Sequence, residues 1–374
     1  MSRPRGLIQV SEPLIGQREI KLVEDCLRRG WVSSAGAYVE AFEQAWASYC
    51  GRKYGVATSS GTAALQVALG CLRLSPGDEV ILPNFTMFSC AAAVLTWGGI
   101  PVLVDADPLT WCLDPTKIEE KITPRTKAIM VVHIYGHPVD MDPVLKLARR
   151  YKLAVVEDAA EAHGAEYKGK RCGSFGDLSC FSFYANKIIT TGEGGMVLTN
   201  RRDYAERARS LRNLYFGKKR RFLHQDVGFN FRLTNLQAAL GLAQLETIEE
   251  RIAHKRWVAS QYNLKLGKDD RLQLPVEMPW AKNVYWMYGI VVKPGSGFDA
   301  ARLSSELKKL NVETRPFFVG LHRQPALRRR GLSSKESFPV SEFLSRHGFY
   351  LPSGLTLTEP QINRVCAAIK KILG

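Results

Sequence analysis

The stretch VVEDAAEAHGAEYKGKRCGSFGDLSCFSFYANKIITTGEGGMVLTN, from Val155 to Asn200, contains the candidate catalytic residues. A buried-strand pattern at 153–156 ends on two acids, Glu157 and Asp158. Further along, Lys187 stands between the apolar CFSFY and the glycine-rich TGEGG. A carboxylate at a strand end and one lysine in a half-apolar loop are candidates for acid–base and nucleophilic chemistry.

Apolar runs typical of strands alternate with helical patterns around this stretch. One strand is expected to begin at Tyr54. Further strands are expected at 77–85, 100–107, 126–136, 153–160 and 194–200. One helix is expected directly after the turn at 58–61, and two more are expected at 89–99 and 141–151. Continuous apolar strands that alternate with helices indicate an α/β fold, with a mostly parallel sheet covered on both faces.

A long helical pattern at 233–266 leads out of this region. The rest of the chain mixes strands such as MYGIVV (287–292) with helices such as DAARLSSELKKL (299–310). At 374 residues the chain suits a large domain plus a smaller one. We expect a large domain with the N-terminal segment over residues 1–250, and a small α+β domain over 251–374.

The balance of charged residues limits the kinds of partner that the protein is expected to bind. The 52 Lys and Arg residues outnumber the 36 Asp and Glu residues, which gives a net charge of +16. Such a charge suits nucleic acid, an acidic membrane surface or a phosphorylated small molecule, or forms a solvated basic surface. The basic clusters at 217–224 and 327–331 lie in no recognisable nucleic-acid-binding motif, so we expect no nucleic-acid partner.

The cysteine pattern and the lack of long apolar runs indicate the cellular compartment of the protein. Eight scattered cysteines without a CxxC pair predict reduced core thiols in a cytoplasmic protein and no structural zinc. No metal site is expected. The chain lacks an apolar run of about 18 residues, so no membrane span is expected. Its N-terminus also lacks the apolar core of a secretory signal.

The segment TSSGTAAL (58–65) places small residues at a turn that opens a helix. Free backbone N–H groups and the helix dipole could hold a phosphate there, although a simple helix cap has the same pattern. The segment is neither a Walker loop nor a GxGxxG fingerprint. Taken singly, Asp158 could cap a helix and Lys187 could be solvated. Together, a phosphate cradle, an acid and a lysine are the parts of a pyridoxal 5′-phosphate (PLP) site.

The chain also resembles the DegT/StrS family of PLP-dependent nucleotide-sugar aminotransferases of fold type I. The matching segments occur in family order: GWVSSAG, SSGTAAL, GDEVILP, VEDAAEAHGAEYKGKRCGSFGD, FSFYANKIITTGEGGM, GFNFRLTNLQAALGLAQLE and VETRPFF. The resemblance implies a mostly parallel seven-stranded sheet between helices and a smaller C-terminal α+β domain.

The resemblance also implies roles for individual residues. Lys187 matches the lysine that forms a Schiff base with the cofactor, and Asp158 matches the partner of its ring nitrogen. Glu161 falls near the position of the cofactor's phenolic oxygen. The phosphate would be held by Gly61, Thr62 and Ser182, together with Asn230 from the neighbouring subunit. A homodimer with shared active sites is therefore implied.

One position departs from the family pattern. After Thr86 the family places an aromatic residue that stacks on the pyridine ring, whereas this chain has Met87 followed by Phe88. Methionine can cover a ring through sulfur and methylene contacts. Either residue could therefore cover the cofactor.

The implied reaction is transamination with L-glutamate as amino donor, 2-oxoglutarate as its product and pyridoxamine phosphate as the intermediate cofactor form. The segments DMDPVL, NKIITTGEGGM and WMY most resemble members that aminate GDP-4-keto-6-deoxy-mannose at C4. Expected substrate contacts are Ser33, Ser34, Arg315 and His322, although a cap or packing role suits each of them too.

Three alternatives remain open. The first is transamination at C3 or C4 of a dTDP- or UDP-linked keto sugar. The second is PLP-dependent sugar dehydration, which the retained Lys187 disfavours because such relatives carry histidine there. The third is a nucleic-acid-binding regulator, which would leave Asp158, Ser182, Lys187 and Asn230 without a purpose.

Overall fold

The computed structural model describes residues 6–217, 220, 222–332 and 336–374. Lys218, Lys219 and Arg221 of the basic cluster at 217–224 lie outside these residues. The main sheet has the strand order β1-β9-β8-β5-β4-β2-β3. Its strands are β1 (Tyr54–Thr58), β2 (Glu79–Pro83), β3 (Ile100–Val104), β4 (Thr126–Val132), β5 (Ala154–Asp158), β8 (Leu178–Ser182) and β9 (Gly195–Thr199).

The main sheet confirms the predicted α/β class. Strands β3, β2, β4, β5 and β8 pair in parallel, whereas β9 is antiparallel to both β8 and β1. Six strands therefore run in one direction and β9 alone runs against them. Most of these strands are buried along nearly their whole length, as expected for a sheet that is covered on both faces.

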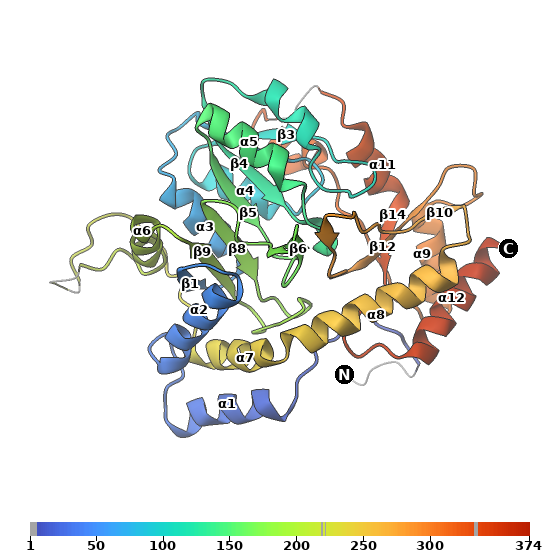
Figure 1. Cartoon of the computed structure of the whole chain (residues 1–374), viewed down its shortest axis with the longest axis horizontal. Helices are drawn as coiled ribbons and strands as arrows, with labels where there is room; N and C mark the ends of the chain where they lie inside the picture. The colour runs from blue at the N-terminus through green and yellow to red at the C-terminus, as the bar shows by residue number, and fades with distance from the viewer. Residues whose placement is uncertain (1–5, 218–219, 221, 333–335) are drawn as a thin grey trace.

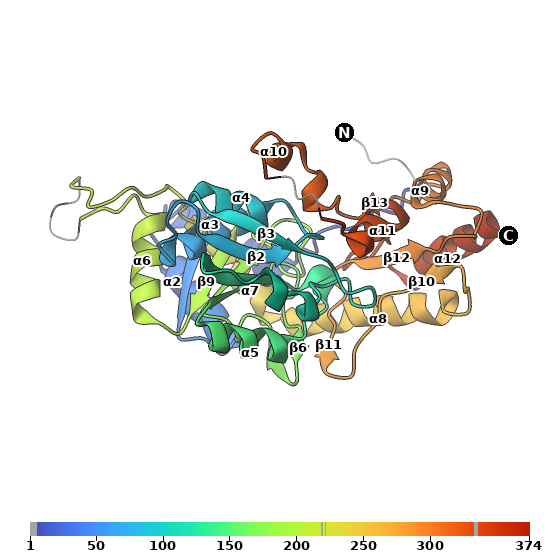
Figure 2. The same cartoon turned by 90° about the horizontal axis from the view of Figure 1, so that it is seen from above.

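Helices cover both faces of this sheet. In Figure 2, α4 and α5 lie on opposite sides of β2 and β3. The α-helices described before residue 247 are α1 (Gln17–Arg28), α2 (Ala37–Tyr49), α3 (Gly61–Cys71), α4 (Ser89–Thr96), α5 (Met141–Tyr151), α6 (Arg202–Arg212) and α7 (Asn235–Glu246). Short 3-10 turns lie at Pro115–Lys117, Glu119–Lys121 and Ile134–Gly136.

A second sheet, with the order β10-β12-β14-β13, forms the smaller α+β part of the chain. Its elements are α8 (Ile248–Leu266), β10 (Leu272–Gln273), β12 (Tyr288–Val292), α9 (Ala300–Lys309), β13 (Arg315–Pro316), a 3-10 turn (Leu321–Arg323), α10 (Pro325–Arg328), α11 (Pro339–His347), β14 (Gly348–Leu351) and α12 (Glu359–Leu373). A third small sheet joins β6 (Glu166–Tyr167), β7 (Lys170–Arg171) and β11 (Ala281–Lys282).

Helix α8 connects the two main parts. It runs from α7 to the end of the molecule that carries the C-terminus (Figure 1). Its early residue Ile252 packs in the large core, whereas Val258 and Tyr262 pack in the small one. The predicted limit at residue 250 falls within this helix, and the domain limits stay a prediction.

The structure differs from the sequence patterns at three places. The single long helix expected at 233–266 is two helices, because Thr247 leaves helical geometry between α7 and α8. Strand β8 was absent from the expected strands. Ile8 packs in the small core and pairs with Val312, although its segment was assigned to the large domain.

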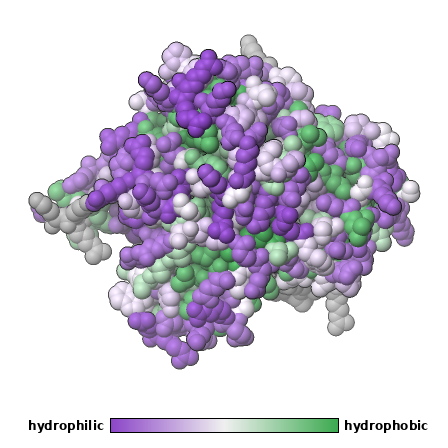
Figure 3. All heavy atoms as spheres, viewed as in Figure 1, coloured by the Kyte–Doolittle hydropathy of each residue, from purple (hydrophilic) through white to green (hydrophobic). Residues whose placement is uncertain are grey.

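Two further features of the fold are the polarity of its surface and the burial of its cysteine thiols. The face in Figure 3 is mostly hydrophilic, with apolar patches in the lower middle of the view. All eight cysteines are buried and free, which confirms the prediction of core thiols. In the described part of the chain, no helix is both long and apolar enough to cross a membrane.

Candidate active site

The candidate site lies at the edge of the main sheet where its parallel strands end. Ser60 and Gly61 follow β1, Asp158 ends β5 and Ser182 ends β8. Because these three strands run in the same direction, their carboxyl ends meet at one edge, where open α/β sheets bind ligands. A pocket of about 400 Å³ opens there.

Seven of the eight residues expected to bind the cofactor line this one pocket. They are Gly61, Thr62, Met87, Asp158, Glu161, Ser182 and Lys187. The small domain supplies Trp286, Phe318 and Tyr350 to the lining. The pocket is therefore built between the edge of the large sheet and an aromatic wall from the small domain.

Asp158 is a buried acid held from two sides. Its Oδ1 accepts a hydrogen bond from the Ala160 N–H at 3.1 Å, and its Oδ2 accepts one from the Cys90 thiol at 3.2 Å. Burial raises the pKa of Asp158, although the charge of Lys187 opposes this. A carboxylate in this position can stabilise a cationic group in the pocket.

The neighbouring acid Glu157 faces away from the pocket, as strand alternation predicts. It is fully buried and accepts hydrogen bonds from the N–H groups of Gly173, Phe175 and Gly176, each at 2.7 Å. Arg52 lies 3.4 Å from it. Burial raises the pKa of Glu157, but hydrogen bonds and neighbouring charges overcome this effect and lower it to about 2.

Lys187 reaches the same pocket from the loop after β8. Its Nζ lies 3.7 Å from Glu161 Oε1 and 3.5 Å from the centre of the Trp286 ring. Burial lowers the pKa of Lys187, although the charges of Glu161 and Asp158 oppose this effect. A lysine with a lowered pKa has a larger share of the neutral amine, which is the nucleophilic form.

Glu161 is held beside Lys187 by the backbone. Its Oε2 accepts a hydrogen bond from the Tyr135 N–H at 2.8 Å. Tyr135 itself adopts a left-handed conformation, with φ of 52°. Burial raises the pKa of Glu161 to about 7, against the opposing charge of Lys187. Glu161 can therefore gain or release a proton near neutral pH.

The start of α3 fits a phosphate group. Ser60 caps the helix by accepting the Ala63 N–H at 3.1 Å. Within the described residues, the N–H groups of Gly61 and Thr62 have no acceptor. A Cβ at position 61 would lie 2.6 Å from Ser182 Cβ, so only glycine lets the helix start approach the serine this closely. Free N–H groups, a helix dipole and a nearby hydroxyl suit a phosphate.

The structure distinguishes Met87 from Phe88. Met87 lines the pocket and is 54% exposed. Phe88 is partly buried, packs against the main core and is not among the described residues that line the pocket. Of these two residues, Met87 is the one that lines the pocket in the described part of the chain.

Three expected site residues lie elsewhere in the chain. Asn230 is exposed and pairs with Asn213 in an isolated bridge. Ser34 lines a different pocket of about 420 Å³, to which Asn213 also contributes. The Ser33 carbonyl accepts the Asn235 N–H at 2.6 Å. Asn230 and Ser34 are thus near each other through Asn213, but outside the Lys187 pocket of their own chain.

The two remaining residues lie near the small-domain side. Arg315 is exposed, pairs with Glu313 at 2.6 Å and stands opposite Tyr350 in the second sheet. His322 is buried, and its two ring nitrogens lie 3.0 Å from Asn84 Oδ1 and from Glu342 Oε1. These contacts give His322 a packing role in the structure.

The aromatic wall of the pocket could not be predicted from the sequence. Trp286 belongs to the WMY segment, and Phe318 ends the VETRPFF segment, yet neither segment has a pattern that predicts a pocket lining. Tyr350 lies on β14, far from both in the sequence. Only the pairing of β12, β13 and β14 brings these three residues together.

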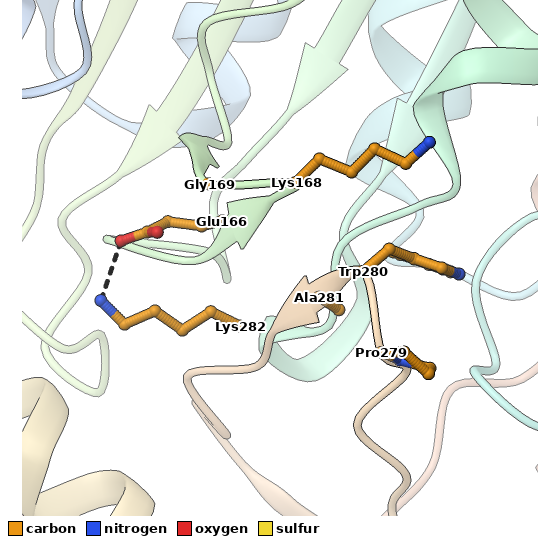
Figure 4. Close-up of a pocket in the computed structure, with 7 residues that line it drawn as sticks. All are labelled: Glu166, Lys168, Gly169, Pro279, Trp280, Ala281 and Lys282. Carbon is orange, nitrogen blue, oxygen red and sulfur yellow. Dashed lines mark hydrogen bonds and ion pairs between the residues drawn. The ribbon is translucent and has the colours of Figure 1, made fainter.

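A second pocket, of about 460 Å³, lies between the β6–β7 hairpin and β11 (Figure 4). Lys168 and Lys282 point away from each other there (Figure 4). Both are already paired, with Asp142 at 2.6 Å and Glu166 at 2.8 Å. Among the described residues that line this pocket, none is a residue expected to bind the cofactor, so the Lys187 pocket is the better candidate.

Known proteins resemble this chain over nearly its whole length. The DegT/DnrJ/EryC1/StrS aminotransferase family matches residues 13–370. "GDP-perosamine synthase" from Caulobacter vibrioides is 43% identical over 98% of this chain and 98% of that protein. "dTDP-3-amino-3,6-dideoxy-alpha-D-galactopyranose transaminase" from Aneurinibacillus thermoaerophilus is 36% identical over 95% of each. The crystal structure of S. venezuelae DesV in complex with a ketimine intermediate has a TM-score of 0.89 at 35% identity and covers 95% of this chain and 94% of its own.

Proposed function

The chain belongs to the DegT/DnrJ/EryC1/StrS aminotransferase family, and we propose that it moves an amino group from L-glutamate to C4 of GDP-4-keto-6-deoxy-mannose, which forms GDP-perosamine. It is a PLP-dependent sugar aminotransferase. The observation that carries the reaction type is the single pocket that combines Lys187, Asp158 and the open start of α3. Likeness to GDP-perosamine synthase supports the choice of substrate.

The residues of the pocket fit PLP group by group. Gly61, Thr62 and Ser182 would hold the phosphate, and Lys187 would bind the aldehyde. Asp158 would keep the ring nitrogen protonated, because an opposite charge beside a base favours its charged form. When bound, PLP supplies an aldehyde that exchanges amino groups and a ring that accepts electrons.

Lys187 also carries protons in this proposal. Once its Nζ is free, the lowered pKa lets the neutral amine take a proton from the amino donor and return one to the sugar carbon. Glu161, 3.7 Å away with a pKa raised to about 7, can exchange protons near neutral pH and balances the charge of Nζ.

We further propose a homodimer in which each site takes Asn230 and the Ser33–Ser34 segment from the partner chain. Asn230 and Ser34 lie together and outside the Lys187 pocket of their own chain, which suits residues that serve another chain. Arg315, next to Tyr350 at the pocket wall, is proposed to contact the substrate. His322 is also proposed to contact the substrate, and its ring would have to exchange the contacts with Asn84 or Glu342 to do so.

The basic charge balance supports a nucleoside diphosphate as the carrier of the sugar. The buried free thiols suit a reducing compartment, and we place the enzyme in the cytoplasm, where its product would enter O-antigen and lipopolysaccharide biosynthesis.

The direct experiment supplies the purified holoenzyme with L-glutamate and a panel of GDP-, dTDP- and UDP-linked 3-keto and 4-keto sugars. The product is identified by mass and NMR. The proposal expects the highest kcat/KM with the GDP-linked 4-keto sugar and an amino group at C4. A preference for a dTDP- or UDP-linked sugar, or amination at C3, would replace this substrate with the alternative one.

A further inference from the structure

Lys255 is a buried cation for which the proposed reaction has no use. It lies on α8, is 2% exposed, and sits where this helix passes from the large core to the small one. Within residues 6–217, 220, 222–332 and 336–374, no carboxylate lies within ion-pair distance of its Nζ. Burial alone lowers the pKa of Lys255 to about 7. An apolar side chain would be cheaper to bury at this position.

The ammonium group of Lys255 joins the ends of two strands. Its Nζ donates to the Trp286 carbonyl at 2.7 Å and also to the Ser353 carbonyl. Tyr288 of β12 pairs with Leu351 of β14, so the same antiparallel register places Trp286 opposite Ser353. The backbone pairing has ended at these two residues. Lys255 therefore bridges the strand pair just beyond its last ladder contact.

Trp286 links this bridge to the catalytic lysine. Its indole Nε1 donates to the Asn186 carbonyl at 2.8 Å, directly before Lys187 in the chain. Its ring lies 3.5 Å from Lys187 Nζ and also stacks on Tyr135. The backbone of Trp286 is thus fixed by Lys255, while its side chain is fixed against the Lys187 loop.

We propose that Lys255 is a positioning residue that clamps the ends of β12 and β14 and so holds the Trp286 ring against Lys187. The clamp connects the small-domain sheet to the reactive amine of the large domain. The inference rests on Lys187 being that amine, but not on which sugar is the substrate. Without the clamp, the indole loses its fixed backbone, and water reaches Lys187 from the small-domain side.

The decisive variant is Lys255→Met, which keeps an unbranched chain of similar length and removes the donor. Lys265→Met on the same helix is the matched control, because Lys265 bonds to Gln261 and does not contact Trp286. Trp286→Phe tests the other half of the link, since it keeps an aromatic ring and removes the bond to Asn186. The double variant, Lys255→Met with Trp286→Phe, tests whether the effects of the two substitutions on Lys187 add or act through the same contacts.

The first readout is the pH midpoint for labelling of Lys187 by an amine-reactive acetylating reagent. It is followed by peptide mass spectrometry on the full-length protein after removal of the cofactor. Burial is the main reason for the lowered pKa of Lys187, so the midpoint should rise by about half a unit or more in Lys255→Met, toward the ordinary lysine value. The midpoint should rise by a similar amount in Trp286→Phe, and the rise in the double variant should be no larger than in either single variant.

The second readout is the kinetics of the holoenzyme with L-glutamate. A displaced amine should lower kcat about tenfold or more and leave KM for L-glutamate within about twofold. Lys265→Met should change neither readout. A folded Lys255→Met protein with the wild-type labelling midpoint and kcat would overturn the proposal.

If Lys255→Met does not fold, Lys255→Gln takes its place and should give the same shift, because its shorter amide cannot reach both carbonyls. Should neither variant fold while Lys265→Met does, the positioning role is contradicted, and Lys255 serves stability alone. Labelling of Lys187 does not involve the sugar. A wrong substrate assignment would therefore appear only in the substrate panel.

Discussion

Replacing Asp158 by Asn separates the charge of this side chain from its shape. The amide oxygen can still accept the Ala160 N–H, so the local turn should persist. The bond with the Cys90 thiol is lost or reversed, which costs about 1 kcal/mol for a neutral hydrogen bond. The folded state should therefore survive this substitution.

The effect on catalysis should be much larger. An opposite charge shifts the pKa of its partner by about one to three units, and each unit corresponds to about 1.4 kcal/mol. Loss of the Asp158 charge should lower the pKa of the cofactor's ring nitrogen by that amount. If the whole difference appears in the transition state, kcat should fall by roughly 10- to 1,000-fold.

The assay follows the half-reaction with L-glutamate by the absorbance of the bound cofactor, together with thermal unfolding of each variant. Glu157→Gln is the control, because Glu157 faces away from the pocket and pairs with Arg52. It should lose about 3 to 5 kcal/mol of stability, as expected when one partner of a buried ion pair is removed. Its rate per folded molecule should change only a few-fold. Near-normal turnover in Asp158→Asn, with loss of turnover in stable Glu157→Gln, would refute the assignment of the acid.

The remaining predictions concern the phosphate cradle, the dimer and the buried lysine. Gly61→Ala places a Cβ 2.6 Å from that of Ser182, so PLP should bind about tenfold or more weakly in a spectroscopic titration; unchanged affinity would contradict the cradle. Mixed subunits of Lys187→Ala and Asn230→Asp should recover activity at one intact site, whereas verified heterodimers without activity would exclude shared sites. The free energy of unfolding should rise with pH between about 7 and 10.5 more steeply in the wild type than in Lys255→Met, because the unfolded chain binds a proton there that the folded chain has released; an equal pH dependence in both proteins, measured by urea unfolding, would contradict the lowered pKa of Lys255.

Local sequence was sufficient for the sheet and for half of the pocket. The apolar runs of β2, β4 and β5 are continuous because these strands are buried on both faces, so their pattern predicts a parallel sheet. The ends of such strands meet at one edge. Strand order could place Asp158 beside the turn at 58–61. Lys187 was joined to them only by its chemistry and by the family resemblance.

The other parts depended on contacts that a local pattern does not contain. Strand β8 is short and carries two serines, Ser179 and Ser182, among its five residues, yet it is fully buried between β5 and β9. Thr247 interrupts a helical pattern that continues on both of its sides. The Trp286 wall and the bridge from Lys255 arise only when α8 and β12 pack together, so neither could be predicted from spacing.

Lys187 is proposed to bind the cofactor and to carry out the transfer. The direct measurement is borohydride reduction of the PLP-loaded protein, followed by peptide mass spectrometry. We expect the reduced cofactor on the peptide that contains Lys187, and a Lys187→Ala protein that stays folded, binds PLP without a covalent link and has lost transamination. A cofactor attached to any other lysine, or transamination that persists in Lys187→Ala, would contradict the account.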